Sequence, residues 1–511
     1  MLRLLFFTYL IFQSYGFLVY PQDDSSPSDE ESSQSPHLRP LAGSPVKNKK
    51  SINIQTSTFS EVVESPAYID KTDFLEAFLR MPKHVHITAP RGFSKSTNLD
   101  MLQYFFEHEL DENFTAKNPE TSKKLEIFKN TKFFKNNSTL FWSHFAKYPV
   151  IKLNFGPLTT KNYTEFQSTF YTHCVRPLLE KFSYLANSTV IVNPEYKNEI
   201  KMMFTPDYPW GEGAMITFGD LLSTYLSNHH GVKPILLIDE IDAPIRSVLF
   251  EKHTPIDGEC IFQFCIVFVD DIIKQEDITR ALLTGRGRIA APYLNYGRGA
   301  LYHEVTIAHS SIFDTKELYG AYGLTKKDVE SYKHDFQLSD LAMENIKSRH
   351  EGYCVYDDKM IFEAKGDKAQ TVRQERPVAK IYNTYSILQR LHAGVEDDWW
   401  IYTAGLQDLE MFFSYKTRLS DKVKECILTN CSFIAKEQLE YMELLDFRTA
   451  INSRNFSSID ENVFLQFCVE SGYFTVLKKF QGKFWIAPPN AEIRERLEAE
   501  ILLLPKKEVT R

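Results

Sequence analysis

Between residues 59 and 308, short apolar runs of strand length alternate with longer stretches of helical periodicity. The strand-like runs are 84–88, 150–155, 235–239 and 281–284, and the helix-like stretches are 96–110, 163–185 and 218–226. Such alternation is typical of βαβ crossovers, in which helices join parallel strands. The pattern therefore predicts an α/β domain over 59–308, built on a mostly parallel sheet.

After residue 310 the periodicity is mainly helical, as in 326–332 and 338–346. We expect a mainly helical domain over 309–498 and a tail over 499–511. Residues 17–58 are rich in Ser, Pro, Asp and Lys and poor in aliphatic side chains. They predict a disordered leader, because such a segment buries too little apolar surface to offset the entropy of ordering.

Residues 1–16 have the layout of a secretory signal peptide. Arg3 precedes an apolar run over 4–12, and Ser14-Tyr15-Gly16 is a small-x-small triplet of the kind that signal peptidase cuts after. The alternative is a membrane anchor, but a spanning helix needs about 20 apolar residues and this run is about half as long. We therefore expect a secreted protein without a membrane span after cleavage, with retention in an internal compartment as the remaining alternative.

Glycosylation triplets and cysteines bear on the same prediction. Acceptor triplets of the form Asn-x-Ser/Thr occur at Asn113, Asn136, Asn137, Asn162, Asn187 and Asn455, with an Asn-Cys-Ser variant at Asn430. The 7 cysteines are an odd number, so in an oxidising compartment at least one stays free or joins another chain. Cys265 follows Cys260 by five positions, as Cys431 follows Cys426, but spacing alone does not determine the pairing.

Composition narrows the classes of function. Of 511 residues, 43% are hydrophobic and 25% charged, which excludes wholesale disorder, collagen-like sequence and coiled coil. The 59 Lys+Arg face 67 Asp+Glu, a formal net charge of −8. Because no basic surplus is available for phosphate backbones, nucleic acid is not an expected partner.

The segment 87–97 lies between a predicted strand and a predicted helix, where a phosphate-binding loop of the form G-x-x-x-x-G-K-[ST] is found. In such a loop the Lys reaches the β- and γ-phosphates and the following hydroxyl holds magnesium. Lys95 and Ser96 occupy these two positions, whereas Ala89 and Ser94 replace the two glycines. The residues predicted to contact nucleotide are Pro90, Arg91, Gly92, Phe93, Ser94, Lys95, Ser96 and Thr97.

A second segment carries complementary chemistry. The apolar run 235–239 ends in Asp239-Glu240, the form taken by a magnesium-organising aspartate followed by a glutamate that activates water. Carboxylates at the C-terminal end of a parallel strand face the crevice where such sheets bind ligands. Phosphoryl transfer requires little beyond this positioning and charge neutralisation. We therefore expect Ser96 and Asp239 to hold Mg²⁺ and Glu240 to be catalytic, with ATP as the nucleotide.

Together these segments resemble the AAA-ATPase-like family of P-loop proteins over about residues 59–498. The motifs that carry the resemblance, in the family's order, are Tyr68-Ile69-Asp70-Lys71-Thr72, 89–96, 102–106, 237–242, Leu283-Thr284-Gly285, 322–325, Glu351-Gly352-Tyr353, Ile381-Tyr382-Asn383, 400–405, 472–475 and Pro488-Pro489-Asn490. The resemblance implies a P-loop NTPase fold, ATP and Mg²⁺ as ligands, and a second catalytic residue in Thr284, at the position of a polar γ-phosphate sensor.

The departures from the family concern activity. Relative to its loop, this chain has lost Arg at Ala89 and Gly92 and Gly at Ser94. A serine in a left-handed conformation costs about 1–2 kcal/mol, so hydrolysis is expected to be weak or lost. Some members end in a restriction-endonuclease-like domain, for which about a dozen residues after the last motif leave no room. Glu363-Ala364-Lys365 has the Glu-x-Lys pattern of such nucleases, but we interpret it as part of a solvated loop.

Two hypotheses follow. In the first, the protein is a secreted AAA-ATPase-like protein that binds Mg-ATP and retains little hydrolysis. In the second, it is a secreted interaction glycoprotein on a catalytically dead ATPase scaffold, with an unknown protein partner. Zinc is not expected, because His303-Glu304 lacks a second histidine four residues after the first, and His84 with His86 fits one face of a strand.

Overall fold

The computed structural model describes residues 39–40, 52–54, 56–250, 254–274, 277–291, 294, 307–356, 376–396, 399, 417–435, 441–453 and 455–503. All of them belong to one compact unit, Arg39–Arg511. The predicted signal peptide lies outside these residues, as do most of the leader and of the tail. Within the described part of the predicted leader, Ile52 is buried.

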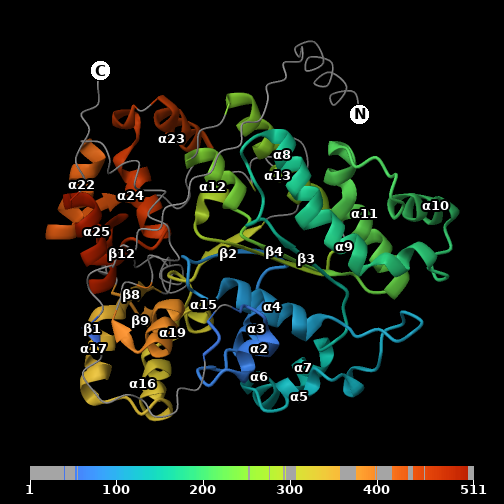
Figure 1. Ribbon diagram of the computed structural model, residues 1–511, viewed down its shortest axis with the longest axis horizontal. Coiled ribbons are helices and arrows are strands. Elements are labelled where there is room, and N and C mark those ends of the chain that lie inside the picture. Colours follow the sequence, from blue (N-terminus) through green and yellow to red (C-terminus); the bar gives the residue numbers. More distant parts are fainter. Residues whose placement is uncertain are drawn as a thin grey trace, which may run out of the picture. The chain divides into compact units, whose positions relative to one another are not determined.

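A five-stranded parallel sheet forms the centre of the first half of this unit (Figure 1). Its order is β3-β4-β5-β2-β6, and every neighbouring pair is parallel. The strands are β2 (His84–Thr88), β3 (Val150–Asn154), β4 (Ile235–Asp239), β5 (Arg280–Gly285) and β6 (Ala308–Ser311). The prediction of an α/β fold on a mostly parallel sheet is confirmed.

Both faces of this sheet are covered by helices. Successive strand side chains point to opposite faces, and in β4 the apolar side chains on both faces are buried. In β4, Ile235 and Leu237 belong to one buried cluster, and Leu236 and Ile238 to another. The first cluster includes residues of α2 (Phe59–Glu64), α3 (Asp73–Arg80), α4 (Lys95–Phe106), α5 (Leu125–Phe128), α6 (Lys132–Asn136), α7 (Ser138–His144) and α15 (Lys316–Tyr322). The second includes residues of α8 (Tyr163–Phe170), α9 (Arg176–Lys181), α10 (Pro194–Met203), α11 (Glu212–His230), α12 (Ala243–Phe250) and α13 (Pro255–Lys274). Figure 1 shows the two layers on either side of the strands.

The second half contains helices and also two antiparallel sheets that the sequence analysis did not predict. The sheets have the orders β7-β9-β8 and β11-β13-β12. Their strands are β7 (Leu324–Thr325), β8 (Glu351–Val355), β9 (Ala379–Tyr382), β11 (Cys431–Ile434), β12 (Thr475–Phe480) and β13 (Lys483–Ala487); the two-residue strands β1 (Arg39–Pro40) and β10 (Val395–Glu396) pair with each other. The helices are α16 (Lys326–Asp335), α17 (Asp340–His350), α19 (Thr384–Ala393), α22 (Arg418–Thr429), α23 (Tyr441–Ser453), α24 (Glu461–Glu470) and α25 (Ala491–Leu503).

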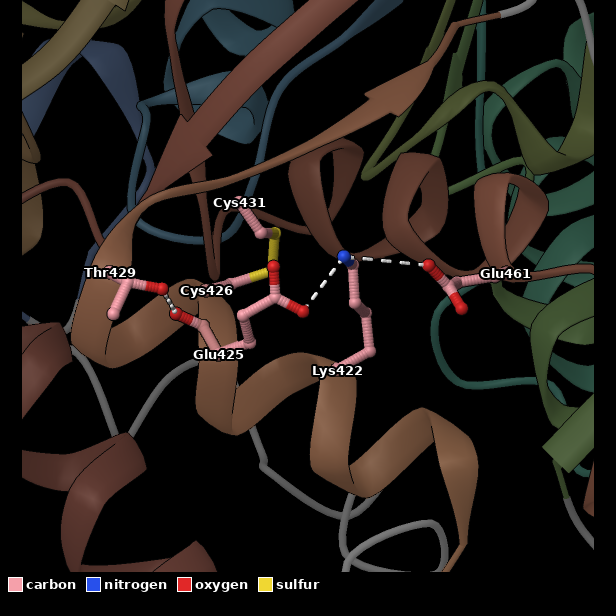
Figure 2. The surroundings of a disulfide bond; sticks show 6 residues. All are labelled: Lys422, Glu425, Cys426, Thr429, Cys431 and Glu461. Atoms are coloured by element: carbon pink, nitrogen blue, oxygen red, sulfur yellow. Dashed lines mark hydrogen bonds and ion pairs between the residues drawn. A yellow bond between two sulfur atoms is a disulfide. The ribbon is translucent and has the colours of Figure 1, made fainter.

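One disulfide is present, between Cys426 at the end of α22 and Cys431 at the start of β11, with Cα atoms 4.4 Å apart. Figure 2 shows its surroundings, where Lys422 Nζ lies 2.9 Å from Glu425 Oε2 and 3.7 Å from Glu461 Oε1. The other five cysteines are free thiols, all buried except the half-buried Cys260: Cys174, Cys260, Cys265, Cys354 and Cys468. The odd number of cysteines required at least one thiol outside an intramolecular disulfide, and the structure has five such thiols.

Across the described ranges, every helix is too short or too polar to cross a lipid bilayer.

Candidate functional site

The loop from β2 to α4 turns sharply before the helix begins. Gly92 has a φ of 81° and Ser94 a φ of 53°, so both lie in the left-handed region. Ser94 occupies the N-cap position of α4 without accepting a hydrogen bond through its side chain. Between them, Phe93 is fully buried and packs edge to face on Phe313 and Tyr353, with ring centroids 5.7 and 5.1 Å apart. The packing of the Phe93 ring thus holds the loop in place, and the loop backbone turns around the N-terminus of α4.

Lys95 is the buried cation of this loop. Its Nζ donates to the carbonyl oxygens of Ala89 at 2.8 Å and Pro90 at 2.9 Å, and the residue is 7% exposed. Burial lowers the pKa of the Lys95 ammonium, and the carboxylates of Glu240 and Asp239 oppose that shift. The loop's own carbonyls therefore hold a lysine that lies close to two acidic side chains.

Asp239 is the point where three segments meet. Its Oδ2 accepts from Ser96 Oγ and its Oδ1 from Thr284 Oγ1, both at 2.5 Å, and the carboxylate is almost fully buried. Thr284 pairs with Ile87 in the register of β5 and β2, so its hydroxyl reaches the same edge of the sheet as the loop. The structure thus brings Ser96, Asp239 and Thr284 into direct contact at the C-terminal ends of the strands.

Glu240 follows in a left-handed conformation, with a φ of 49°. Its backbone N–H donates to Asp239 Oδ1 at 3.0 Å, and its Oε2 lies 3.5 Å from Arg286 Nη2. The backbone N–H of Arg286 donates to Asp242 Oδ2 at 2.9 Å. The predicted catalytic glutamate therefore sits at the edge of the site beside an arginine for which the sequence analysis proposed no role.

Asn383, at the N-cap of α19, holds the loop from the second half of the chain. Its Nδ2 donates to the Arg91 carbonyl at 2.8 Å, while its Oδ1 accepts from Ser386 N at 3.1 Å. The backbone N–H of Tyr385 donates to the Gly92 carbonyl at 3.0 Å. The sequence analysis included Asn383 only as part of a family motif. An Asn preceding a helix signals a cap, but nothing local indicates that it also reaches the loop.

A cavity of about 120 Å³ lies beside the start of α4. Ser94, Thr97, Asn98 and Met101 line it on the side of the loop and α4, and the rest of its wall comes from residues within 52–71, 321–332 and 384–388. Tyr68 and Tyr322 also line it, and their buried hydroxyls have no hydrogen-bond partner among the residues that the structure describes. Burial raises the pKa of both phenols, so they stay neutral donors.

The oxygen set at the loop suits a hard divalent cation. Mg²⁺ prefers carboxylate and hydroxyl oxygens, often one or two from the protein with the rest from phosphate and water, and Asp239 with Ser96 matches that set.

No group of three or more His, Cys, Asp and Glu that could hold a metal occurs in the described part of the chain. His84 and His86 lie on one face of β2, and His86 Nδ1 is 3.0 Å from His309 Nδ1. The segments 303–304 and 363–365 lie outside the described residues.

The seven glycosylation candidates differ in exposure. The exposed side chains are Asn113, Asn136, Asn187, Asn430 and Asn455. Asn137 and Asn162 are half-buried and cap α7 and α8 through their Oδ1 atoms. Their amide nitrogens, which a glycan would modify, donate to Glu76 and Glu165 at 3.0 and 2.8 Å. The first five therefore present the more accessible acceptors.

Comparisons with known proteins bear on the same segments. Residues 53–293 match the model of a family described as "Predicted AAA-ATPase". Among solved structures, the chain is similar to the Walker-type ATPase of Pyrococcus abyssi, with 11% sequence identity and a TM-score of 0.37. The likeness covers 88% of this chain and 99% of that one. No curated protein matches.

Proposed function

We propose, on the premise that this chain belongs through residues 53–293 to the AAA-ATPase-like family, that it binds ATP with Mg²⁺ at the loop before α4. We further propose that hydrolysis is weak or lost and that the protein works in the secretory route. The observation that carries the proposal is the contact of Asp239 with the hydroxyls of Ser96 and Thr284, both at 2.5 Å.

That contact supports cation binding because it joins the three groups before any ligand arrives. Ser96 and Asp239 supply the oxygen ligands for Mg²⁺, which when bound would neutralise phosphate charge. Lys95 would exchange the two loop carbonyls for phosphate oxygens, since an ammonium at this buried place is better stabilised by an anion than by neutral carbonyls. Thr284, whose hydroxyl also contacts Asp239, would contact the terminal phosphate.

The cavity next to Thr97 and Asn98 supports a place for the nucleotide base. A flat aromatic base fits a small cavity with apolar walls and a few polar groups that set its orientation. The unpartnered hydroxyls of Tyr68 and Tyr322 supply such groups, because a buried hydroxyl without a partner costs about 1–3 kcal/mol that a ligand acceptor would recover.

Weak turnover follows from the backbone at Ser94. The left-handed φ of 53° occurs at the position where the family has glycine, and the added Cβ costs about 1–2 kcal/mol in this conformation. The strain falls on the residue that immediately precedes Lys95. A loop strained there is less well prepared to hold a transition state than to tolerate a bound ground state.

The proposed secretory route rests on the signal-like N-terminus and on the exposed acceptors, such as Asn113 and Asn187. The Cys426–Cys431 disulfide is consistent with an oxidising compartment. A glycosylated interaction protein on a dead scaffold is the competing function, and nucleotide binding separates the two.

The test is a titration of the secreted, glycosylated protein with Mg-ATP, followed by calorimetry and by Tm. Binding that requires Mg²⁺ and disappears in Lys95→Ala supports the proposal. Lys124→Ala is the control, because the partly buried Lys124, like Lys95, donates to a backbone carbonyl, that of Glu107 at 2.9 Å. Absence of binding in the wild type, or equal binding in Lys95→Ala, overturns the proposal. Fast turnover abolished by Glu240→Gln would refute weak hydrolysis and exclude the dead scaffold.

A further inference from the structure

Arg286 is a largely buried cation with too little anionic contact. Its side chain is 12% exposed, and its Nη2 meets Glu240 Oε2 at 3.5 Å. Its Nε is buried and has no hydrogen-bond partner within the described residues. Within the described residues, its one other contact with an acid is made by its backbone, whose N–H donates to Asp242.

These contacts leave the guanidinium poorly compensated. A charge-assisted N–H···O bond measures about 2.7–2.9 Å, so the 3.5 Å approach to Glu240 is loose. A guanidinium presents five N–H donors in a planar fork that matches carboxylate or phosphate. Because an unpaired buried cation is costly, the geometry of Arg286 favours a second anion that arrives from outside the chain.

The position of Arg286 identifies which anion. It stands two residues after Thr284, whose hydroxyl touches Asp239, and it faces Glu240, which follows Asp239 directly. Lys95 lies near the same carboxylates. An anion that reaches Arg286 therefore enters the edge of the sheet where Ser96 and Asp239 would hold the cation and Lys95 the phosphates.

We propose that Arg286 binds the terminal phosphate of a nucleoside triphosphate, and that Glu240 is its partner only while that phosphate is absent. The inference rests on the proposed function and adds a preference for triphosphate over diphosphate. It also assigns a consequence to binding: when Arg286 turns to phosphate, the Glu240 carboxylate loses its cationic partner and becomes available to orient water.

The test compares the affinity of Mg-AMPPNP, a triphosphate analogue that resists hydrolysis, with that of Mg-ADP. Arg286→Ala is expected to weaken AMPPNP binding by about 10- to 100-fold, the range of one or two charge-assisted hydrogen bonds, and ADP binding by less than about twofold. Arg286→Lys keeps a positive charge without the fork and is expected to lie between wild type and alanine for AMPPNP alone. It also provides a folded variant if the alanine variant is unstable.

Glu240→Gln provides the second arm. If Glu240 holds Arg286 in the empty site, removing its charge should tighten AMPPNP binding, and this gain should vanish in Glu240→Gln/Arg286→Ala. Equal losses for AMPPNP and ADP in Arg286→Ala, or unchanged affinity for both, overturn the inference and leave the proposed function in place. Failure of the wild type to bind either nucleotide overturns both.

Discussion

The side chain of Asn383 fills the space in front of the Cα atom of Gly92. A Cβ added to Gly92 would lie 2.4 Å from Asn383 Oδ1 and 2.8 Å from its Nδ2. The same amide donates to the neighbouring Arg91 carbonyl. The loop between β2 and α4 and the N-cap residue of α19 are therefore closely packed across 291 positions of sequence, and each constrains the conformation of the other.

Gly92→Ala should disturb this contact and weaken Mg-ATP binding. The φ of 81° alone costs an L-residue about 1–2 kcal/mol, and the new methyl group must displace Asn383 from the Arg91 carbonyl. We expect a loss of about 2–3 kcal/mol in the free energy of unfolding together with lower affinity. Urea unfolding and calorimetric titration measure the two effects.

Substitutions at two other glycines separate the cost of the left-handed dihedral from the cost of the clash with Asn383. Gly231 has a φ of 67° and open space around its Cα, so Gly231→Ala carries the dihedral cost without a clash. Gly213 lies in α11 with open space, and Gly213→Ala should stabilise by about 0.5–1 kcal/mol. If Gly92→Ala costs no more than Gly231→Ala, the contact with Asn383 has no energetic weight. In Gly92→Ala/Asn383→Ala, removal of the clash should return part of the lost stability.

Ser94→Gly should both stabilise the protein and tighten Mg-ATP binding. The substitution removes about 1–2 kcal/mol of strain from the left-handed conformation. It also lowers the free energy of unfolding by about 0.4–1 kcal/mol, because glycine increases the conformational entropy of the unfolded chain. The expected net gain is about 0.5–1 kcal/mol in the free energy of unfolding, with the loop better prepared for phosphate.

Gln337→Gly is the matched control for this substitution. Gln337 also has a left-handed φ, of 52°, but it lies exposed between α16 and α17. It should gain similar stability without changing the affinity for Mg-ATP. An affinity that stays at the wild-type value in Ser94→Gly would show that the serine is not what weakens the site.

Four of the five strands of the central sheet could be predicted, because each is a short and largely apolar run next to a helical stretch. The fifth, β6, has the sequence Ala-His-Ser-Ser and carries no such run, so it was not predicted. The run 235–239 matches β4, and 84–88 matches β2. The proximity of Ser96 to Asp239 followed from the same rule, since parallel strands place their C-terminal ends on one edge of the sheet. Even the strain at Ser94 could be anticipated conditionally, from the glycine that it replaces.

The antiparallel sheets could not be predicted in this way. Their strands are two to six residues long and carry charges, as in β12, where Lys478 and Lys479 occur together. Motifs that looked unrelated turn out to meet: a Cβ on Gly352 would strike the Pro489 carbonyl, and Cys354 N donates to Thr475 Oγ1. Such contacts depend on tertiary packing, which no local periodicity encodes.

Acid should destabilise the protein through buried histidines. Burial lowers the pKa of His86 and of His230 to about 3 and that of His108 to about 4. The unfolded chain, with pKa values near 6.5, therefore binds more protons than the folded chain between about pH 6.5 and 4. Above that range the free energy of unfolding is not reduced by these histidines. Within it, the free energy of unfolding decreases with decreasing pH by about 1.4 kcal/mol per pH unit for each histidine.

His108→Leu isolates one of these groups. The buried Nδ1 of His108 has no partner within the described residues, so leucine removes a titrating group and no side-chain hydrogen bond at that atom. Between pH 6.5 and 4.5, the slope of unfolding free energy against pH should decrease by about 1.4 kcal/mol per unit. An unchanged slope in His108→Leu would mean that His108 already ionises in the folded state.

Reduction should cost the protein the stability that the Cys426–Cys431 disulfide supplies. Closing so short a loop removes about 2 kcal/mol of chain entropy from the unfolded state. We expect urea unfolding of the wild type to shift by about that amount on adding reductant, and Cys426→Ser/Cys431→Ser to match the reduced protein and ignore reductant. Cys260→Ser, which removes the half-buried free thiol, should behave as wild type.

Thiol counting provides an independent measurement of the same bond. Alkylation in denaturant without reductant should label five thiols, and seven after reduction. In the folded protein, labelling should begin at Cys260, because burial raises the pKa of Cys174, Cys265 and Cys468 and shields their sulfur atoms. A count of three before reduction would reveal a second disulfide, and seven would show that Cys426 and Cys431 are not joined.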